Sequence, residues 1–327
     1  MFFSLERISK SFAGKHVLHE VSIEVEAGEL VSIVGPSGVG KTTLLAIIAG
    51  MEQPDSGRVR FATAPNRRNP VILVFQDYLL FPHMTVLGNV AFGLKARRIG
   101  RKERARRSLR MLEFFGLADK AGSYPAELSA GQKQRAAIAR AMVVEPSVLL
   151  LDEPFANLDR NLKTDTARFI RETQQSFGTT TLSVTHDLEE AFAMSDRMGI
   201  MLDGRLVRHG TPADIYHRPG SLEAARFLGS VNRVPPQLYP LICPGSGNPS
   251  HGESFFRPEA LRVIPDGEGP GVVANVTFAG HYIIYTVRLA GHAFTVYGQG
   301  AGLSSGDRVR VEIDPAHEPC QTMEVAS

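Results

Sequence analysis

The sequence predicts two folded parts: a parallel α/β domain over residues 1–230 and a small all-β domain over residues 254–327, with a linker at 231–253. Three observations support this prediction. Short apolar strands alternate with helical patterns as far as about residue 230, which is typical of a parallel sheet covered by helices. Pro, Gly and Ser then become dense from Val231 onwards, and this composition favours a linker. The remaining residues form short alternating strands separated by glycines, as in a small barrel.

Continuous apolar or β-branched runs mark the buried strands of the first domain, because the strands of a parallel sheet are covered on both faces. These runs are 30–34, 71–75, 147–152 and 179–184. The stretch between the second and third runs, about 85–142, is mostly helical in pattern and predicts a helical subdomain. An Asp-Gly pair between two apolar runs predicts a β-hairpin at 199–210.

The composition is that of a globular protein, since 43% of the 327 residues are hydrophobic and 21% are charged. A net charge of +2 gives no bulk attraction to nucleic acid. Cys243 and Cys320 are too few for a disulfide framework, which suits a reducing cytosol. The sequence has no signal-peptide core and no apolar run near the roughly 20 residues of a membrane-spanning helix. We therefore expect any membrane role to be peripheral, through a partner.

The segment "GPSGVGKTT" (35–43) matches the phosphate-loop pattern G-x-x-x-x-G-K-[ST]. It lies between a predicted strand and a predicted helix, where backbone N-H groups and the helix N-terminus face phosphates. This placement predicts a P-loop NTPase rather than a flexible glycine-rich turn. Lys41 is expected to pair with the β and γ phosphates, and Thr42 to bind Mg²⁺. The candidate nucleotide-binding residues of the loop are Gly35, Ser37, Gly38, Gly40, Lys41, Thr42 and Thr43.

Two carboxylates follow the apolar strand of "VLLLDEP" (148–154). The carboxyl ends of parallel strands are where such folds bind ligands. Asp152 is therefore expected to hold the metal through water, and Glu153 to polarise the water that attacks the phosphate. Taken alone, the pair is also compatible with a solvated turn.

The segment "LSAGQKQRAAIARAM" (128–142) resembles the signature motif of ATP-binding cassette (ABC) ATPases. The other motifs of that family occur in the expected order. They are Phe12, the phosphate loop, Gln76 in "VFQDYLLFPHMTV", the Asp-Glu strand, "ANLD" (156–159) and His186 in "SVTHD".

The resemblance implies a site shared by two chains, in which the signature motif of one chain closes over the ATP held by the phosphate loop of the other. Ser129 then offers a hydroxyl, Gly131 a backbone N-H, and Gln132 the start of a helix, all directed at the γ-phosphate. A serine that only caps a helix would look similar. Ala130 departs from the usual glycine of this motif, and is tolerated only if its φ stays negative.

The resemblance also implies roles for four single residues. Phe12 would stack on adenine, with a purely structural core position as the alternative. Gln76 would touch Mg²⁺ and the attacking water, and would lie near a transmembrane partner. His186 would bind the γ-phosphate, although a histidine after a strand is often structural. Asp159 would join the active site of the facing subunit.

Two further segments resemble those of bacterial importers. Residues 77–94 are similar to those of import ATPases for polyamines, ferric iron and sulfate, and "FFRPEALRV" (255–263) resembles the start of a TOBE domain, a small OB-like barrel. Such a domain either holds a dimer together or binds a regulatory ligand. The basic run at 95–110 contains regularly spaced apolar residues, so we interpret it as a solvated helical face and expect no nucleic-acid partner.

The resemblance thus implies the ATPase of a bacterial importer, with ATP and Mg²⁺ as its cofactors. It would act as a homodimer on transmembrane permease subunits, at the cytoplasmic face of the inner membrane, with a solute-binding protein outside. The substrate stays open among polyamine, ferric iron, sulfate, molybdate and phosphonate. A soluble ABC ATPase acting on nucleic acid or ribosomes is the first alternative. A simple P-loop kinase or GTPase is the second.

Overall fold

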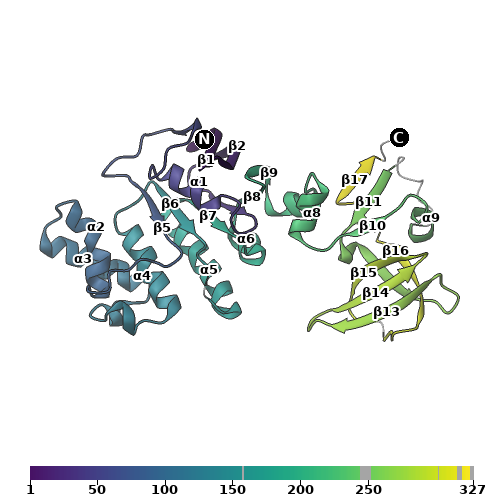
Figure 1. Ribbon diagram of the computed structural model, residues 1–327. Coiled ribbons are helices and arrows are strands. Elements are labelled where there is room, and N and C mark those ends of the chain that lie inside the picture. The colour runs from purple at the N-terminus through teal and green to yellow at the C-terminus, as the bar shows by residue number, and fades with distance from the viewer. Residues whose placement is uncertain (157, 244–251, 301, 315–318, 325–327) are drawn as a thin grey trace. The chain divides into compact units, whose positions relative to one another are not determined.

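The computed structural model describes residues 1–327 except 157, 244–251, 301, 315–318 and 325–327. The chain forms two compact units, Met1–Pro212 and Ala213–Ser327 (Figure 1). Within the described residues, no helix is both long and apolar enough to cross a membrane.

A six-stranded sheet forms the centre of the first unit, in the order β5-β6-β7-β3-β8-β9. Every neighbouring pair is parallel except β8 and β9. Asp203 and Gly204 join these last two strands with positive φ, as a tight hairpin requires. The predicted strands and hairpin are confirmed. The bounds are β3 (Leu30–Val34), β5 (Val71–Val74), β6 (Val148–Asp152), β7 (Thr180–Thr185), β8 (Arg197–Leu202) and β9 (Arg205–Gly210).

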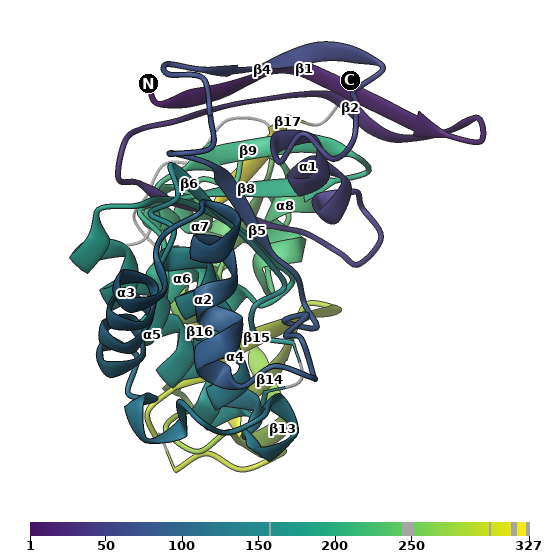
Figure 2. The same ribbon diagram turned by 90° about the vertical axis from the view of Figure 1, so that its left-hand side faces the viewer.

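A second, antiparallel sheet covers one side of this unit, in the order β2-β1-β4. Figure 2 shows it lying across the top of the unit, with the helix α1 (Lys41–Ile48) beneath it. Leu5 of the antiparallel sheet, Leu45 of the helix and Ile33 of the parallel sheet belong to one buried cluster. The strand bounds are β1 (Phe3–Phe12), β2 (Lys15–Val25) and β4 (Ser56–Phe61).

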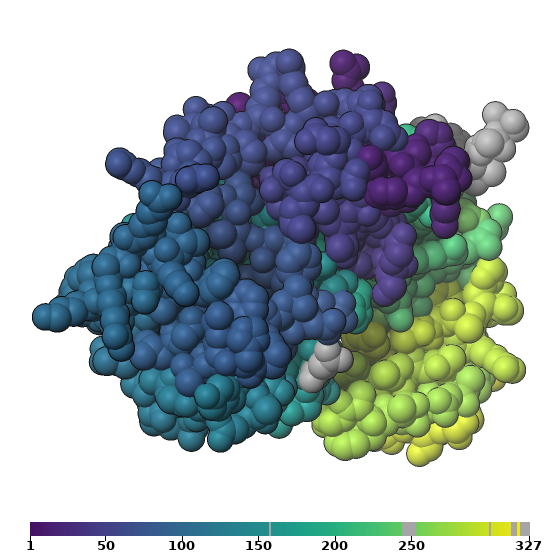
Figure 3. All heavy atoms as spheres, turned by 60° about the vertical axis from the view of Figure 1, so that its left-hand side comes forward, coloured from purple at the N-terminus to yellow at the C-terminus, as the bar shows by residue number. Residues whose placement is uncertain are grey.

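Helices occupy the stretch for which the sequence predicts a helical subdomain. Their apolar faces form a second cluster that includes Val90, Leu112 and Ala137, together with Leu149 of the parallel sheet. In Figure 3 the blue atoms of this stretch project at the edge of the first unit. The bounds are α2 (Val86–Ala96), α3 (Arg101–Phe114), η1 (Ala118–Lys120), η2 (Pro125–Glu127) and α4 (Ala130–Met142), followed beyond β6 by α5 (Arg160–Phe177) and, after β7, α6 (Leu188–Met194).

The second unit is built on a five-stranded antiparallel sheet in the order β12-β16-β13-β14-β15, with Tyr285 and Phe294 in its core. A three-stranded sheet, β10-β11-β17, lies in the same unit. The fold class, an α/β P-loop NTPase with a small all-β OB-like domain, is confirmed. The bounds are α7 (Pro212–His217), α8 (Leu222–Leu228), β10 (Asn232–Val234), α9 (Tyr239–Ile242), β11 (Gly252–Phe256), η3 (Pro258–Ala260), β12 (Leu261–Pro265), β13 (Gly271–Phe278), β14 (Ile283–Leu289), β15 (His292–Gly298), β16 (Arg308–Ile313) and β17 (Gln321–Glu324).

Arg257 anchors the start of the "FFRPEALRV" segment within the second unit. Its side chain is buried, and its guanidinium donates to the carbonyls of Ala225 and Tyr216, at 2.9 and 3.2 Å. It also lies 4.4 Å from the centre of the Tyr216 ring. This arginine therefore ties the β domain to α7 and α8. The sequence predicted that the first domain extends to residue 230, which would include α8. The contacts of Arg257 explain why α8 instead belongs to the second unit.

Candidate functional site

The phosphate loop connects the end of β3 at Val34 with the start of α1 at Lys41. Gly38 and Gly40 have φ values of 80° and 105°, a left-handed conformation that glycine adopts without strain. A side chain at Gly40 would also lie 2.8 Å from Leu18. The loop is thus shaped by its glycines and leads directly into a helix N-terminus, as phosphate binding requires.

Lys41 is 95% buried and its ammonium group is held across the loop. Its Nζ donates to the carbonyl oxygens of Gly35 and Pro36, at 2.8 and 3.0 Å. It also lies 3.3 Å from Oε1 of Glu153. The positive charge is therefore fixed between the phosphate loop and the end of β6.

The side-chain oxygens of Thr42 and Asp152 lie together beside the phosphate loop. The Thr42 hydroxyl donates to Oδ1 of Asp152 at 3.0 Å. Burial raises the pKa of Asp152, and the hydrogen bond from Thr42 opposes that rise. A hydroxyl and a carboxylate beside a phosphate-binding loop fit Mg²⁺, which uses one or two protein oxygens together with phosphates and water.

Glu153 connects the two sides of the site. Its Oε1 faces Lys41, and its Oε2 lies 2.8 Å from Nδ1 of His186 and accepts from the His186 backbone N-H at 3.2 Å. Its φ of 47° is rare for a residue with a side chain, and its own N-H donates to Val184. The carboxylate is thus held at the shared edge where β3, β6 and β7 end.

Two further predicted residues, Gln76 and Phe12, lie at strand ends in different sheets. Gln76 is exposed and follows β5, the strand next to β6. Phe12 ends β1 and is 45% exposed, with Nζ of Lys10 at 5.2 Å from its ring centre. The alternative that Phe12 fills the core is therefore wrong. An exposed aromatic face is available for stacking instead.

The signature segment begins with a capped helix. Ser129 is the N-cap of α4: its Oγ accepts from the Gln132 N-H at 3.3 Å, and its own N-H donates to the Gln132 side chain at 3.0 Å. Ala130 has no positive φ, so alanine is not strained at this position. Among the described residues, no hydrogen bond or ion pair joins this segment to the phosphate loop.

Asp159 caps the next helix along the chain. Its Oδ1 accepts from the N-H of Leu162 at 3.0 Å at the start of α5, and the residue is exposed. Leu162 also lies 3.8 Å from the place of a Cβ on Gly131, so nothing inside the chain fills the space over that glycine closely. Asn157, within "ANLD", lies outside the described residues.

Arg140 is a contact of the site that the sequence analysis missed. Its guanidinium donates to the carbonyls of Tyr78 and Leu79, at 3.0 and 2.8 Å, and lies 5.4 Å from the Phe81 ring. Tyr78 and Leu79 both have positive φ, at 60° and 42°. Arg140 therefore fixes the strained stretch after Gln76. The sequence contained no signal for it beyond one arginine among several in "QKQRAAIARAM".

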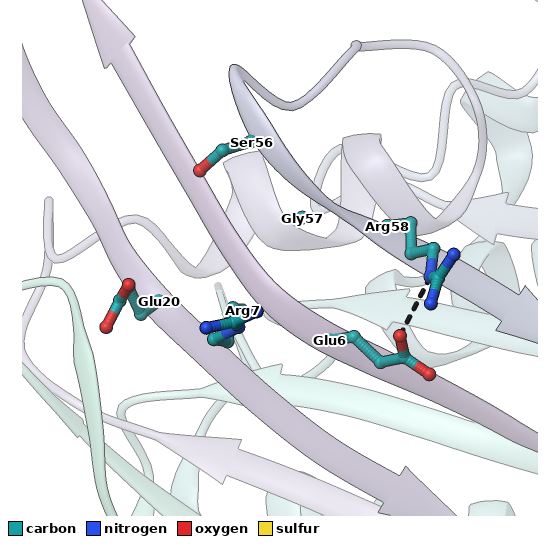
Figure 4. Close-up of a pocket in the computed structure, with 6 residues that line it drawn as sticks. All are labelled: Glu6, Arg7, Glu20, Ser56, Gly57 and Arg58. Carbon is teal, nitrogen blue, oxygen red and sulfur yellow. Dashed lines mark hydrogen bonds and ion pairs between the residues drawn. The ribbon is translucent and has the colours of Figure 1, made fainter.

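The antiparallel sheet carries a separate cavity of about 410 Å³ (Figure 4). Arg7, Glu20 and Gly57 line it, and all three have positive φ where the strand register shifts. An ion pair between Arg58 and Glu6 closes one side at 2.8 Å. None of the predicted site residues lines this cavity. The candidate site is instead an open edge, as suits a surface that a second molecule completes.

Comparisons with known proteins agree with this geometry. The family model described as "ABC transporter" matches residues 18–156, and the one described as "TOBE domain" matches residues 256–318. The Fe(3+) ions import ATP-binding protein FbpC of Rhizobium etli is 46% identical over 237 residues, which are 71% of this chain and 67% of that protein. The sulfate/thiosulfate import ATP-binding protein CysA 2 of Agrobacterium fabrum is 44% identical over 244 residues, 72% of this chain and 71% of that protein.

A solved structure shows the same fold. The dimeric structure of MJ0796, a bacterial ABC transporter cassette, matches with a TM-score of 0.57 and 31% identity, over 64% of this chain and 98% of that chain. The residues that the "ABC transporter" family model matches, 18–156, contain the phosphate loop, the Asp-Glu strand and the signature segment described above. The chain therefore belongs to the ABC transporter family, as an ATP-hydrolysing import subunit with a C-terminal TOBE domain.

Proposed function

We propose that this subunit hydrolyses ATP in sites shared by two copies of the chain and energises the import of an inorganic ion, ferric iron or sulfate. The observation that supports ATP hydrolysis best is the position of Glu153. Its two carboxylate oxygens face Lys41 and His186, at 3.3 and 2.8 Å, at the end of the phosphate loop. A carboxylate in this position is suited to orient and deprotonate a water next to a γ-phosphate.

Each residue of this edge receives a role in the proposal. Lys41 binds the β and γ phosphates, Glu153 acts as the general base, and His186 contacts the γ-phosphate. Gln76 lies on the neighbouring strand end and senses the nucleotide. Phe12 stacks on adenine. The residues that hold the phosphates through the loop are Gly35, Ser37, Gly38, Gly40, Thr42 and Thr43.

Mg²⁺ fits the oxygen pair of Thr42 and Asp152, with Gln76 as a further ligand. When bound, the ion supplies charge neutralisation for the phosphate oxygens. The hydrogen bond between Thr42 and Asp152 keeps both ligands in place without it.

In this proposal, the signature segment that closes over the ATP comes from the partner copy. Ser129, Gly131 and Gln132 of that copy face the γ-phosphate, and its Asp159 borders the same site. Ser129 and Asp159 are both exposed and both cap helices, so their surroundings are rigid while their outer sides are free to meet another chain. The matching ABC cassette was solved as a dimer, which supports the same arrangement.

The names of the relatives favour ferric iron or sulfate over the other substrates considered from the sequence. In this proposal the subunit binds peripherally to a membrane permease at the cytoplasmic face of the inner membrane, and a solute-binding protein delivers the ion from outside. A role on nucleic acid or ribosomes is not favoured, because the relatives are import proteins.

Co-purification of a membrane permease with this subunit tests the proposal. We expect the tagged chain, isolated from detergent-solubilised membranes of its own cells, to carry a polytopic membrane protein in about equal amount. A solute-binding protein encoded beside it should bind ferric iron or sulfate in a titration. Ribosomal proteins without a membrane partner would contradict the transport role, and a solute-binding protein that ignores both ions would contradict only the substrate.

A further inference from the structure

An ion pair connects the helix capped by Asp159 to the loop that carries His186. Lys163 lies in the first turn of α5, and its Nζ is 2.5 Å from Oδ2 of Asp187, the residue directly after His186. The two side chains are only 27% and 16% exposed. The Asp187 N-H also donates to the Thr185 hydroxyl at 2.9 Å, so the backbone on either side of His186 is fixed.

Asp159 is part of the same helical turn. Its side chain accepts from the N-H of Leu162, the residue before Lys163. A helical turn is a rigid element whose groups move together. The pair of Lys163 and Asp187 therefore joins the two residues for which we propose opposite tasks, since His186 contacts this chain's own nucleotide and Asp159 borders the partner's site.

Glu190 lies in the first turn of α6, three residues after Asp187. It is 96% buried, and its Oε2 has no hydrogen-bond partner among the described residues. Burial, followed by a hydrogen bond with Asp187, raises the pKa of Glu190 to about 7. Interactions with Glu190 and with Lys163 lower the pKa of Asp187 despite its burial.

Few other charges reach this cluster. On α6, Glu189 forms an outer ion pair with Arg160 of α5 at 3.7 Å, with both side chains largely exposed. His186 lies beside Asp187. The strand β3, which also packs on α6, has no titratable side chain in its sequence LVSIV. The buried pair, Lys163 and Asp187, joins α5 to the N-cap of α6. The exposed pair, Arg160 and Glu189, joins α5 to the first turn of α6, so the two pairs differ mainly in exposure.

We propose that Lys163 and Asp187 are positioning residues that hold His186 and Asp159 in one rigid arrangement. The inference rests on the proposed roles of His186 and Asp159. Neither residue of the pair needs to touch the nucleotide. Their effect is on the alignment of the site, and misalignment of this kind costs roughly tenfold to a hundredfold in rate.

Substitution of the lysine tests the positioning role. Lys163→Met should lower kcat for ATP hydrolysis by the purified subunit roughly tenfold or more, with KM for ATP unchanged, because alignment is lost and binding is kept. Lys163→Arg should restore most of the rate. Glu189→Gln breaks the exposed pair between the same helices and should leave the rate unchanged. Equal losses in Lys163→Met and Glu189→Gln, or a kcat within twofold of the native value in Lys163→Met, would overturn the inference.

The pH dependence gives a second readout that a purely structural role would not change. Glu190 has a raised pKa, so its neutral form is present below pH 7 and is lost as the pH rises through about 7. The buried carboxylate of Glu190, once ionised, repels the carboxylate of Asp187 and so weakens the arrangement, and kcat should decline above neutrality. Glu190→Gln keeps a neutral side chain at this position. It should retain the rate at pH 7 and flatten this alkaline decline, and an alkaline decline that persists unchanged in Glu190→Gln would show that the charge beside Asp187 does not affect alignment.

Glu153→Gln separates failure of this inference from failure of the proposed site. If that variant loses hydrolysis while Lys163→Met remains active, the site stands and the positioning role falls. If Glu153→Gln remains active, the proposed catalytic site itself is contradicted. The inference about Lys163 and Asp187 then loses its basis, because it rests on that site.

Discussion

At the scale of single residues, Glu153 occupies an unusual backbone conformation. A residue with a side chain at φ 47° costs on the order of 1–3 kcal/mol and persists only where its surroundings fix it. Here Val184 accepts the Glu153 N-H, while Lys41 and His186 hold its carboxylate. The carboxylate is thus fixed beside the phosphate loop, which suits a base that must meet a water at one defined position.

Replacing this base should separate binding from hydrolysis. Glu153→Gln keeps the size and the hydrogen-bonding capacity of the side chain but removes its basicity. We expect the affinity for ATP to be retained and the rate of hydrolysis to fall about 10²- to 10⁴-fold. Phosphate release and equilibrium ATP binding measure the two effects. Hydrolysis near the native rate would show that another group is the base.

Residue identity at the edge of the sheet was predictable, because motif spacing and strand ends indicate Lys41, Asp152 and Glu153 from the sequence alone. The contacts between them were not. Nothing in the amino-acid sequence indicates that Glu153 takes a positive φ. Nor does it indicate that Lys163 forms an ion pair with Asp187, 24 residues further along the chain. Such contacts depend on how two distant elements pack, and packing is set by the whole core.

At the scale of elements, continuous apolar runs predicted the central strands well, because burial on both faces leaves a clear signal. The antiparallel sheet was harder to predict. Its strands are irregular, with register shifts in the pairing of β1 with both neighbours, and β4 pairs with β1 rather than with the strand that follows it. Partial burial and bulges blur the alternation of apolar residues on which strand prediction depends.

The contact between α4 and the stretch after Gln76 leads to a prediction at this scale. Arg140→Met removes both hydrogen bonds to the strained carbonyls of Tyr78 and Leu79. We expect the amides of residues 76–84 to exchange with solvent about tenfold faster or more, since strained backbone opens once its anchor is lost. Hydrogen exchange followed by mass spectrometry measures this directly.

Arg135→Met is the matched control on the same helix. Arg135 lies 4.9 Å from the Phe169 ring and is exposed, so its loss should leave exchange at 76–84 unchanged. Unchanged exchange in Arg140→Met as well would mean that other contacts hold this stretch.

At the scale of the whole molecule, each chain carries two parts of a nucleotide site that it does not join by itself. The phosphate loop lies beside the proposed base, Glu153, and the proposed metal ligands, Thr42 and Asp152, while the signature segment is a capped helix start whose outer side is exposed. Family resemblance predicted that these parts meet between two copies. The geometry of one chain supports this, because Ser129 is held rigidly by its own helix and still exposed.

The most direct test of the shared nucleotide site is a disulfide between the phosphate loop of one copy and the signature segment of the other. The chain would carry Ser37→Cys in the phosphate loop and Ser129→Cys in the signature segment, with Glu153→Gln to retain ATP, and Cys243→Ser and Cys320→Ser to remove the native thiols. The measurement is the yield of covalently linked dimer after mild oxidation. We predict a high yield with ATP and little with ADP. A cross-link within one chain, or a yield independent of ATP, would contradict the shared site.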